Sequence, residues 1–176
     1  MSLEQLWAGW RHEYVTSATD AERSVGEPGA RRDGGCVFCR LAEVGEPSEE
    51  NGVVWRGSTC FVVLNAYPYA SGHLLVLPMR HLGELPELTA EESAELWEVT
   101  RLATVALTAA YDPDGLNIGA NLGRAAGAGI PGHLHLHALP RWSGDTNFMT
   151  SVGGLRVLPE TLQSSWRRLR DAWPGT

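Results

Sequence analysis

Lysine is missing from the sequence of 176 residues, so all 14 of its Lys/Arg cations are arginine. Without lysine the chain has no Schiff-base chemistry and no P-loop lysine. An excess of basic residues is missing too, because the formal net charge is −7, whereas proteins that bind nucleic acid are normally basic. We therefore expect no nucleic-acid partner. Any phosphate site has to use arginine, histidine, hydroxyl or backbone N–H groups.

Long apolar runs and a disulfide framework are missing as well. No run reaches the roughly 18 apolar residues of a membrane span, and the first residues lack the basic and apolar regions of a signal peptide. The three cysteines do not make a disulfide framework. We therefore expect a cytoplasmic protein without membrane contact. The content of 43% hydrophobic and 20% charged residues fits one globular domain.

Five apolar segments predict strands. Two of them flank Gly57-Ser58, which is a hairpin signal. The predicted strands are residues 53–56, 60–64, 73–78, 116–121 and 133–139.

Three segments with helical periodicity accompany these strands. Capping boxes at Ser2/Gln5 and Thr89/Glu92 precede two of the helices, and Pro159 opens the third. The predicted helices are residues 3–14, residues 90–111 and the segment after Pro159, where Leu162, Trp166, Leu169 and Trp173 share a face. The fold class is therefore α+β, with one long helix inserted among antiparallel strands and a helix near each end. We divide the chain into residues 1–35 (helix and flexible segment), 36–142 (main domain) and 143–176 (loop and helix).

The segment "GHLHLHALPRW" at residues 132–142 carries three of the six histidines. His133, His135 and His137 occupy alternate positions, which places them on one face of a strand. A purely structural explanation fits a lone histidine better than three at strict period two. Two functional readings remain open: ligands of a catalytic zinc ion, or a nucleophilic imidazole oriented by its neighbours.

The loop before the histidines favours the nucleophile. Residues 119–132 hold five glycines and Arg124. Glycines allow backbone N–H groups to approach an anion closely, as in phosphate-binding loops. Glycine also serves ordinary turns, so the loop alone is weak evidence. Together with the histidine face it indicates phosphate chemistry.

The histidine segment resembles the signature of the histidine-triad (HIT) superfamily, His-x-His-x-His followed by two apolar residues. Residues 36–39, 64–81 and 115–127 resemble other segments of that superfamily in order and spacing. The resemblance covers about residues 36–142 and implies the HIT-type antiparallel sheet. The chain ends are similar to a narrower branch, the actinobacterial diadenosine tetraphosphate phosphorylases.

The resemblance implies a role for each histidine. His135 matches the nucleophile, which attacks the α-phosphate of a nucleotide and forms a nucleotidyl-histidine intermediate. His137 matches a residue that hydrogen-bonds the phosphate, and His133 is the first histidine of the triad. His73 matches a histidine across the sheet that helps to orient the cluster, although an ordinary histidine at a strand start is the alternative.

The same resemblance implies the substrate contacts. Asn65 matches a ribose contact, Leu64 an apolar wall for the base, and Asn121 with the following loop a phosphate site. The loop positions are Arg124, Gly127 and Gly129. Many relatives carry glutamine where this chain has Gly129, and its loss leaves room for inorganic phosphate as the acceptor.

We therefore expect phosphorolysis of diadenosine tetraphosphate to ATP and ADP. The alternative is a HIT-type hydrolase of dinucleoside polyphosphates or nucleoside phosphoramidates that releases AMP. A nucleotide-binding module with little turnover and a zinc hydrolase using the three histidines are further alternatives.

The pair Cys36-x-x-Cys39 has three readings. The first is a redox pair, but the usual βαβ context of such a pair is missing. The second is two buried cysteines without a chemical role, which are common in protein cores. The third is a structural zinc site, which needs two more ligands. Some relatives have that zinc site, and the resemblance implies Cys36, Cys39, His81 and His133 here. It also implies a homodimer that pairs two sheets edge to edge. Separately, we expect magnesium to accompany the polyphosphate without a dedicated protein site. The expected partners are adenine nucleotides, dinucleoside polyphosphates and inorganic phosphate.

Overall fold

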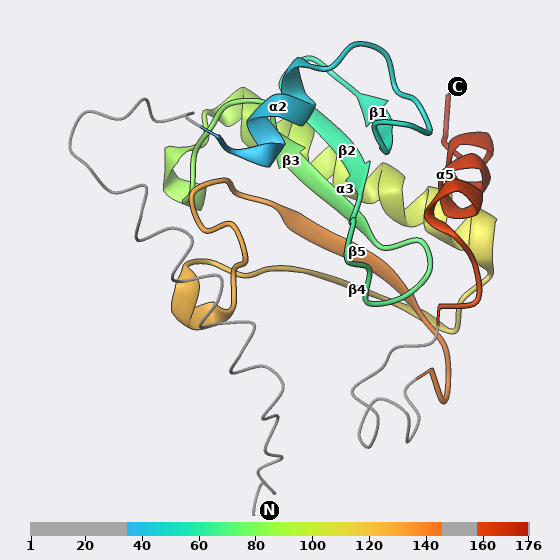
Figure 1. The fold of residues 1–176 in the computed structure, drawn as a ribbon. Helices are drawn as coiled ribbons and strands as arrows, with labels where there is room; N and C mark the ends of the chain where they lie inside the picture. Colours follow the sequence, from blue (N-terminus) through green and yellow to red (C-terminus); the bar gives the residue numbers. More distant parts are fainter. Residues whose placement is uncertain (1–34, 146–157, 176) are drawn as a thin grey trace, which may run out of the picture. The chain divides into compact units, whose positions relative to one another are not determined.

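A computed structural model describes residues 35–145 and 158–175, and in this part five strands form one antiparallel sheet (Figure 1). The strand order is β1-β2-β3-β5-β4, and every neighbouring pair is antiparallel. The strands are β1 (Val53–Arg56), β2 (Cys60–Leu64), β3 (Leu74–Pro78), β4 (Gly115–Ala120) and β5 (Leu136–Arg141). The predicted hairpin of residues 53–56 and 60–64 is confirmed.

Within residues 35–145 and 158–175, three helices accompany the sheet: α2 (Val37–Glu43), α3 (Ala90–Tyr111) and α5 (Leu162–Asp171). The prediction for α3 is confirmed together with its capping box, in which Thr89 and Glu92 bond each other's backbone N–H groups. Helix α2 was not predicted. Two short 3₁₀ helices, η1 (Leu85–Glu87) and η2 (Arg124–Ala126), lie in the connections. The predicted helix over residues 3–14 lies outside the described residues.

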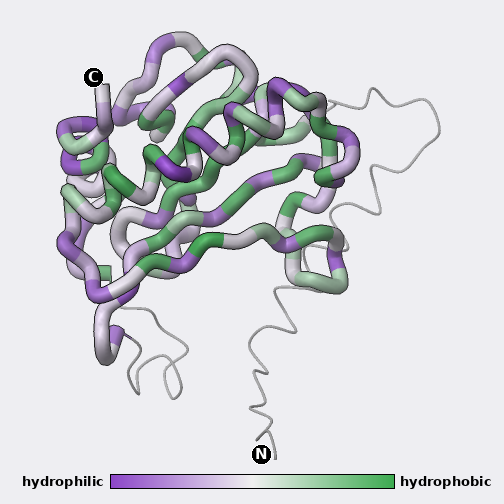
Figure 2. The backbone as a smooth tube through the Cα atoms, turned by 180° about the vertical axis from the view of Figure 1, so that it is seen from behind, coloured by the Kyte–Doolittle hydropathy of each residue, from purple (hydrophilic) through white to green (hydrophobic). Residues whose placement is uncertain are grey.

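The sheet has a hydrophobic core on each face because strand side chains alternate between the two faces. In β2, Val62 packs in the core beneath α3, whereas Phe61 and Val63 pack in the core beneath α2. Figure 2 shows hydrophobic stretches along the strands. The expected α+β architecture is confirmed, and α2 and α3 contribute to different cores.

Helix α5 covers the outer edge of β1. The indole N–H of Trp166 donates to the Val53 carbonyl at 2.8 Å, and Arg170 donates to the Val54 carbonyl at 3.1 Å. These bonds occupy carbonyl groups that an edge strand would otherwise present to another chain. The helix begins at Leu162 rather than at Pro159, because Thr161 acts as the N-cap and accepts the Ser164 N–H.

The histidine strand begins later than predicted. Strand β5 starts at Leu136, so His133 and His135 lie in the segment directly before it. The ladder with β3 ends at the pair Val76–Leu136. Further along β3, Pro78 has no N–H to donate to this segment. Among the described residues, no helix has the length and apolar content to cross a bilayer.

Candidate active site

Four histidines follow one another along the sheet, from His73 at the start of β3 to His133, whose ring bonds the Pro78 carbonyl at the end of β3. His137 lies in β5, His133 and His135 precede β5, and His73 precedes β3. Ring centroids are 5.1 Å apart between His73 and His137, and 5.2 Å apart between His135 and His137. His73 and His133 are fully buried, and His135 is 7% exposed. The structure therefore brings together the four histidines that the sequence singled out.

The proton position on His135 follows from one hydrogen bond. Its Nδ1 atom lies 2.8 Å from the carbonyl oxygen of His133. A carbonyl oxygen only accepts, so Nδ1 carries the proton. In the neutral ring Nε2 then holds a lone pair. The segment before β5 thus presents His135 in the tautomer that a nucleophile needs.

A second set of hydrogen bonds fixes the tautomers of His73 and His137. The backbone N–H of Tyr69 donates to His73 Nδ1 at 3.1 Å, so that atom accepts and the proton lies on Nε2. This Nε2 lies 2.8 Å from Nδ1 of His137. The side-chain amide of Asn65 also contacts His73 Nδ1, at 3.3 Å. His137 therefore accepts at Nδ1 and carries its proton on Nε2.

The Nε2–H of His137 is buried and has no hydrogen-bond partner within the described residues. A buried donor without a partner lowers the stability of the folded protein, and such donors are rare in native structures. An oxygen of a bound phosphate group would satisfy it. The relay from Tyr69 through His73 thus ends in a donor beside the nucleophile.

Burial keeps the triad histidines neutral. Desolvation lowers the pKa of His133 and of His137 to about 4, and for His137 the neighbouring His135 adds to this effect. Desolvation also lowers the pKa of His135, against the opposing effect of its bond to His133. At pH 7 the lone pair of His135 is therefore available.

The face of the sheet beside His137 is open toward β4. A row of directly opposite residues crosses the sheet, formed by Val63, Leu75, His137 and Gly119. Opposite residues of an antiparallel pair share a face. A Cβ at Gly119 would meet nothing within 4 Å. This glycine leaves space for a substrate group next to His137.

The loop after β4 carries the predicted phosphate contacts. Asn121 donates through its side-chain amide to the Gly127 carbonyl at 3.3 Å, which closes the loop. Gly127 has φ +91°, a left-handed conformation that favours glycine. Arg124 lies exposed in η2, and Gly129 is partly buried.

Leu64 lines one cavity together with His73, but it lies on the other face of the sheet from His137. Its side chain belongs to the core beneath α3, on the face of the sheet opposite to Val63 and His137. Its neighbour Asn65, by contrast, contacts His73 directly. Of the two residues predicted for the nucleoside, Asn65 bonds His73, and the role of Leu64 stays a prediction.

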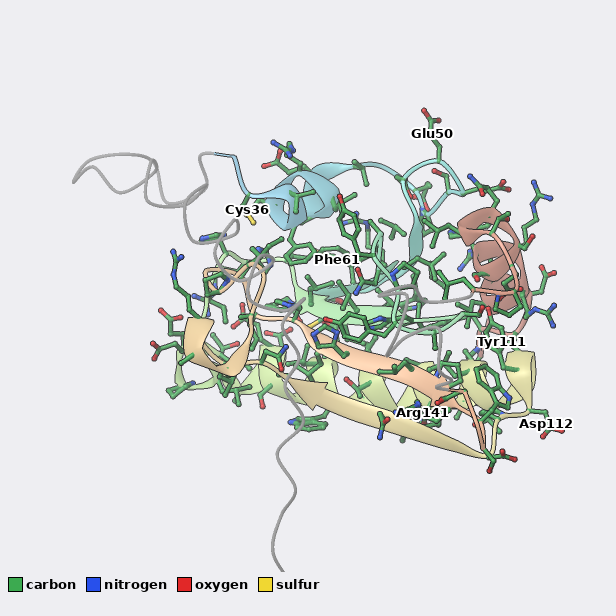
Figure 3. All side chains as sticks on the ribbon, turned by 60° about the horizontal axis from the view of Figure 1, so that its bottom comes forward. Cys36, Glu50, Phe61, Tyr111, Asp112 and Arg141 are labelled. Carbon is green, nitrogen blue, oxygen red and sulfur yellow. The ribbon has the colours of Figure 1, made fainter. Side chains whose placement is uncertain are left out.

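A second cluster shares His133 with the triad. It consists of Cys36, Cys39, His81 and His133, whose possible ligand atoms all lie within 4.8 Å of one another. His133 donates its Nε2–H to the Pro78 carbonyl at 2.9 Å, so the lone pair of Nδ1 faces the sulfur atoms. Sulfur-to-Nδ1 distances are 3.5 Å (Cys36–His133), 3.6 Å (Cys39–His133) and 3.1 Å (Cys39–His81). Figure 3 shows Cys36 at the start of α2.

These distances fit a metal ion. In a tetrahedral zinc site with Zn–S near 2.3 Å and Zn–N near 2.0 Å, sulfur and nitrogen ligands stand about 3.5 Å apart. Two thiolates and two imidazoles are also a usual donor set of structural zinc. The cluster can therefore hold a metal ion, and its four residues are the ones that the sequence comparison with HIT proteins had implied.

Sequence reasoning missed two aromatic residues of the site. Phe38, between the two cysteines, lies 5.2 Å from His135 and 5.5 Å from His133 between ring centroids. Tyr69 lies parallel to His137 at 5.9 Å and close to His73 at 4.6 Å. Both lie within four residues of a residue that the sequence singled out, and that proximity is the signal that could have found them.

Comparison with known proteins agrees with this site. A model of the HIT domain family matches residues 46–144. The AP-4-A phosphorylase of Mycobacterium tuberculosis (strain CDC 1551 / Oshkosh) is 39% identical over 171 residues, which cover 97% of this chain and 85% of that protein.

Two solved structures are also similar. A zinc-bound histidine triad family protein from Mycobacterium smegmatis has a TM-score of 0.61 and 30% identity, with coverage of 80% of this chain and 94% of that one. A hypothetical histidine triad nucleotide-binding protein from Sulfolobus tokodaii has a TM-score of 0.62 and 28% identity, with coverage of 78% and 91%. The family match, the relative over nearly the whole chain and the shared fold lead to one conclusion: the chain belongs to the HIT domain family.

Proposed function

We propose that this protein is a nucleotidyl-transferring enzyme that cleaves diadenosine tetraphosphate by phosphorolysis, with His135 as the nucleophile. One observation carries the proposal: His135 has its proton fixed on Nδ1 by the His133 carbonyl, and it stands beside the buried, unpartnered Nε2–H of His137. A nucleophile and a donor next to each other are what transfer of a phosphoryl-linked group requires.

The reaction takes two displacements at phosphorus. In the first, the Nε2 lone pair of His135 attacks the α-phosphorus, the bond from phosphorus to the bridging oxygen breaks, and ATP leaves. The Nε2–H of His137 donates to that bridging oxygen as it departs with ATP. In the second, an oxygen of inorganic phosphate attacks the same phosphorus, the P–N bond breaks, and ADP leaves with His135 regenerated.

Two observations support phosphate as the acceptor. The relative with 39% identity is named AP-4-A phosphorylase. This chain also has Gly129 in the loop before the triad, at the position where the HIT resemblance implies glutamine in many relatives. A water acceptor would instead release AMP, and the assay below separates the two outcomes.

The remaining substrate contacts are proposed from their positions. Asn65 contacts the ribose, since it bonds His73 at the edge of the histidine cluster. Asn121, Gly127 and Gly129 shape the phosphate loop, and the exposed Arg124 offers the positive charge that this loop needs for a polyphosphate. Magnesium accompanies the polyphosphate through the phosphate oxygens.

We further propose that Cys36, Cys39, His81 and His133 bind a structural zinc ion. The support is the donor set, the sulfur-to-nitrogen distances and the tautomer of His133. Bound zinc would cross-link α2 to the segment before β5, and the chemistry of transfer stays with His135. Thiols that bind zinc fit the reducing environment of the cytoplasm.

A homodimer through β4 completes the proposal. This strand lies at the edge of the sheet, with Ile118 exposed to 46%. The other edge, β1, is covered by α5. An edge strand with open backbone groups and an exposed apolar residue is suited to pair with a second copy.

The test is a product assay with diadenosine tetraphosphate, with and without inorganic phosphate, and with His135→Ala as the control. ATP plus ADP, formed only with phosphate and lost in the variant, is the expected result. ATP plus AMP formed regardless of phosphate would make the enzyme a hydrolase. No turnover in either condition would overturn the proposal.

A further inference from the structure

The loop between β2 and β3, residues 65–73, is held from two sides. On one side Tyr69 stacks on His137. On the other side the ring of Tyr111, the last residue of α3, lies against Gly72: a Cβ at Gly72 would be 2.5 Å from Tyr111 Cε2. Gly72 has φ +76° and directly precedes His73. Tyr111 thus contacts the backbone one residue from the histidine that orients His137.

Tyr111 is in turn held by the segment that begins α5. Its hydroxyl donates to Glu160 Oε1 at 2.5 Å, and the hydroxyl of Ser165 donates to the same oxygen at 2.8 Å. The guanidinium of Arg168 lies 5.3 Å from the centre of the Tyr111 ring and 3.5 Å from Glu160 Oε2. Figure 3 shows Tyr111 beside α5. The Glu160 side chain is only 14% exposed, so water competes little with these bonds.

A cavity of about 300 Å³ lies next to this contact. The loop and the C-terminal segment line it together, with Ala66, Pro68 and Ser71 on one side and Leu158, Thr161 and Leu162 on the other. The back of the loop is therefore incompletely packed there. The contact from Glu160 through Tyr111 to Gly72 joins the two segments that line this cavity.

We propose that Tyr111 and Glu160 are positioning residues for the transfer step: they fix the loop so that His73 keeps its Nε2–H on His137, and His137 keeps its own Nε2–H toward the phosphate. This inference rests on the proposed function. It assigns a positioning role to Glu160, which lies beyond the segment that the HIT domain model matches. A substitution at Glu160 would therefore change the reaction through the orientation of His137.

The test compares two substrates that differ in leaving group. Diadenosine tetraphosphate expels ATP through a terminal phosphate oxygen, which is helped by a proton donor, whereas the 2,4-dinitrophenyl ester of AMP expels a far more acidic phenol that needs little help. In Tyr111→Phe the ring stays on Gly72 but the bond to Glu160 is lost. We expect kcat with diadenosine tetraphosphate to fall about tenfold, with KM within twofold and the 2,4-dinitrophenyl rate nearly unchanged, as for partial loss of a general-acid contact.

Variants at Glu160 supply the matched comparison. Glu160→Ala removes the acceptor and should behave as Tyr111→Phe does, whereas Glu160→Gln keeps an oxygen acceptor and should restore most of kcat. Trp166→Phe is the control, because it removes a hydrogen bond that holds α5 on β1 rather than on the loop. It should lower the melting temperature without changing the ratio of the two rates.

A spectroscopic measurement tests the positioning without turnover. The proton between His73 Nε2 and His137 Nδ1 should give a protected downfield imidazole signal in the wild type, weakened in Tyr111→Phe and retained in Trp166→Phe. A retained signal in Tyr111→Phe, or equal loss of both rates, would overturn the inference. If the wild type cleaves neither substrate, the proposed function fails, and this signal still decides whether Tyr111 positions His137.

Discussion

His135 Nδ1 donates to the carbonyl oxygen of His133 at 2.8 Å, and this bond joins the proposed nucleophile to a ligand of the proposed metal site. The two clusters thus share one short stretch of chain. Its backbone carbonyl fixes the tautomer of His135, while the imidazole of His133 faces the cysteines. Changes at one cluster should therefore be measurable at the other.

Breaking the relay to His137 should slow the reaction without abolishing it. In His73→Phe the ring volume remains, but the donor to His137 Nδ1 is lost, so His137 no longer has its proton fixed on Nε2. We expect kcat to fall by about 10- to 100-fold, the usual effect of losing a partner that orients an active-site group. Steady-state kinetics measure this. An unchanged kcat would show that His137 needs no orientation.

The stability of the protein should depend on the protonation of His137. Its pKa is lowered to about 4 in the folded protein, whereas an unfolded histidine has a pKa near 6.5. The unfolded chain therefore takes up a proton that the folded chain refuses as the pH falls below about 6.5. The contribution of neutral His137 to the free energy of unfolding is fully present above pH 6.5 and is lost progressively as the pH falls toward 4.

Urea unfolding between pH 7.5 and pH 4.5 measures the dependence, and His137→Asn should reduce its slope. An NMR titration of the His137 Cε1–H should give a midpoint near 4. A midpoint near 6.5 would contradict the burial of this ring.

Removing one cysteine of the pair should abolish metal binding. We expect one zinc per chain in the wild type and almost none in Cys39→Ser, with a lower melting temperature, because the ion would tie α2 to the segment before β5. Cys60→Ala is the matched control, since Cys60 is a buried core residue that does not belong to the metal cluster. Elemental analysis and thermal unfolding decide the outcome. Zinc retained in Cys39→Ser would exclude this site.

A charge on the open edge of the sheet should dissociate the proposed dimer. Ile118→Arg places a cation in the middle of β4, where two copies would pair. Leu162→Arg is the control, because Leu162 is exposed to a similar degree on α5, 39% against 46% for Ile118. Light scattering should give the mass of a monomer for the first variant and of a dimer for the second. A wild type that is monomeric at micromolar concentration would refute the dimer.

Local signals predicted much of the fold. The hairpin followed from two β-rich runs around Gly57-Ser58, and α3 from a capping box before an apolar stripe. Helix α2 was missed because it has only seven residues and one of them buried, Phe38, which leaves no periodic stripe to detect. The start of β5 was placed too early because alternation continues through His133 and His135, although the backbone ladder does not.

The part of the site that residue type and spacing reveal was predictable from the sequence. The alternating histidines and the glycine loop pointed to the nucleophile, and the family pattern named the metal ligands. The contact of Tyr111 with Glu160 joins residues 49 positions apart, and no sequence pattern brings them together. Leu64 is next to Asn65 in the sequence, yet its side chain joins the core beneath α3, because alternation along the strand decides the face of each side chain.

The most direct test of the central claim is to trap the intermediate on His135. The protein is mixed with diadenosine tetraphosphate without inorganic phosphate, quenched in alkali because P–N bonds are labile in acid, and measured by intact mass and peptide mapping. We predict one adenylyl group per chain on His135, formed together with released ATP and absent from His135→Ala. ATP release from a protein that stays unmodified, or an adduct on another residue, would contradict the account.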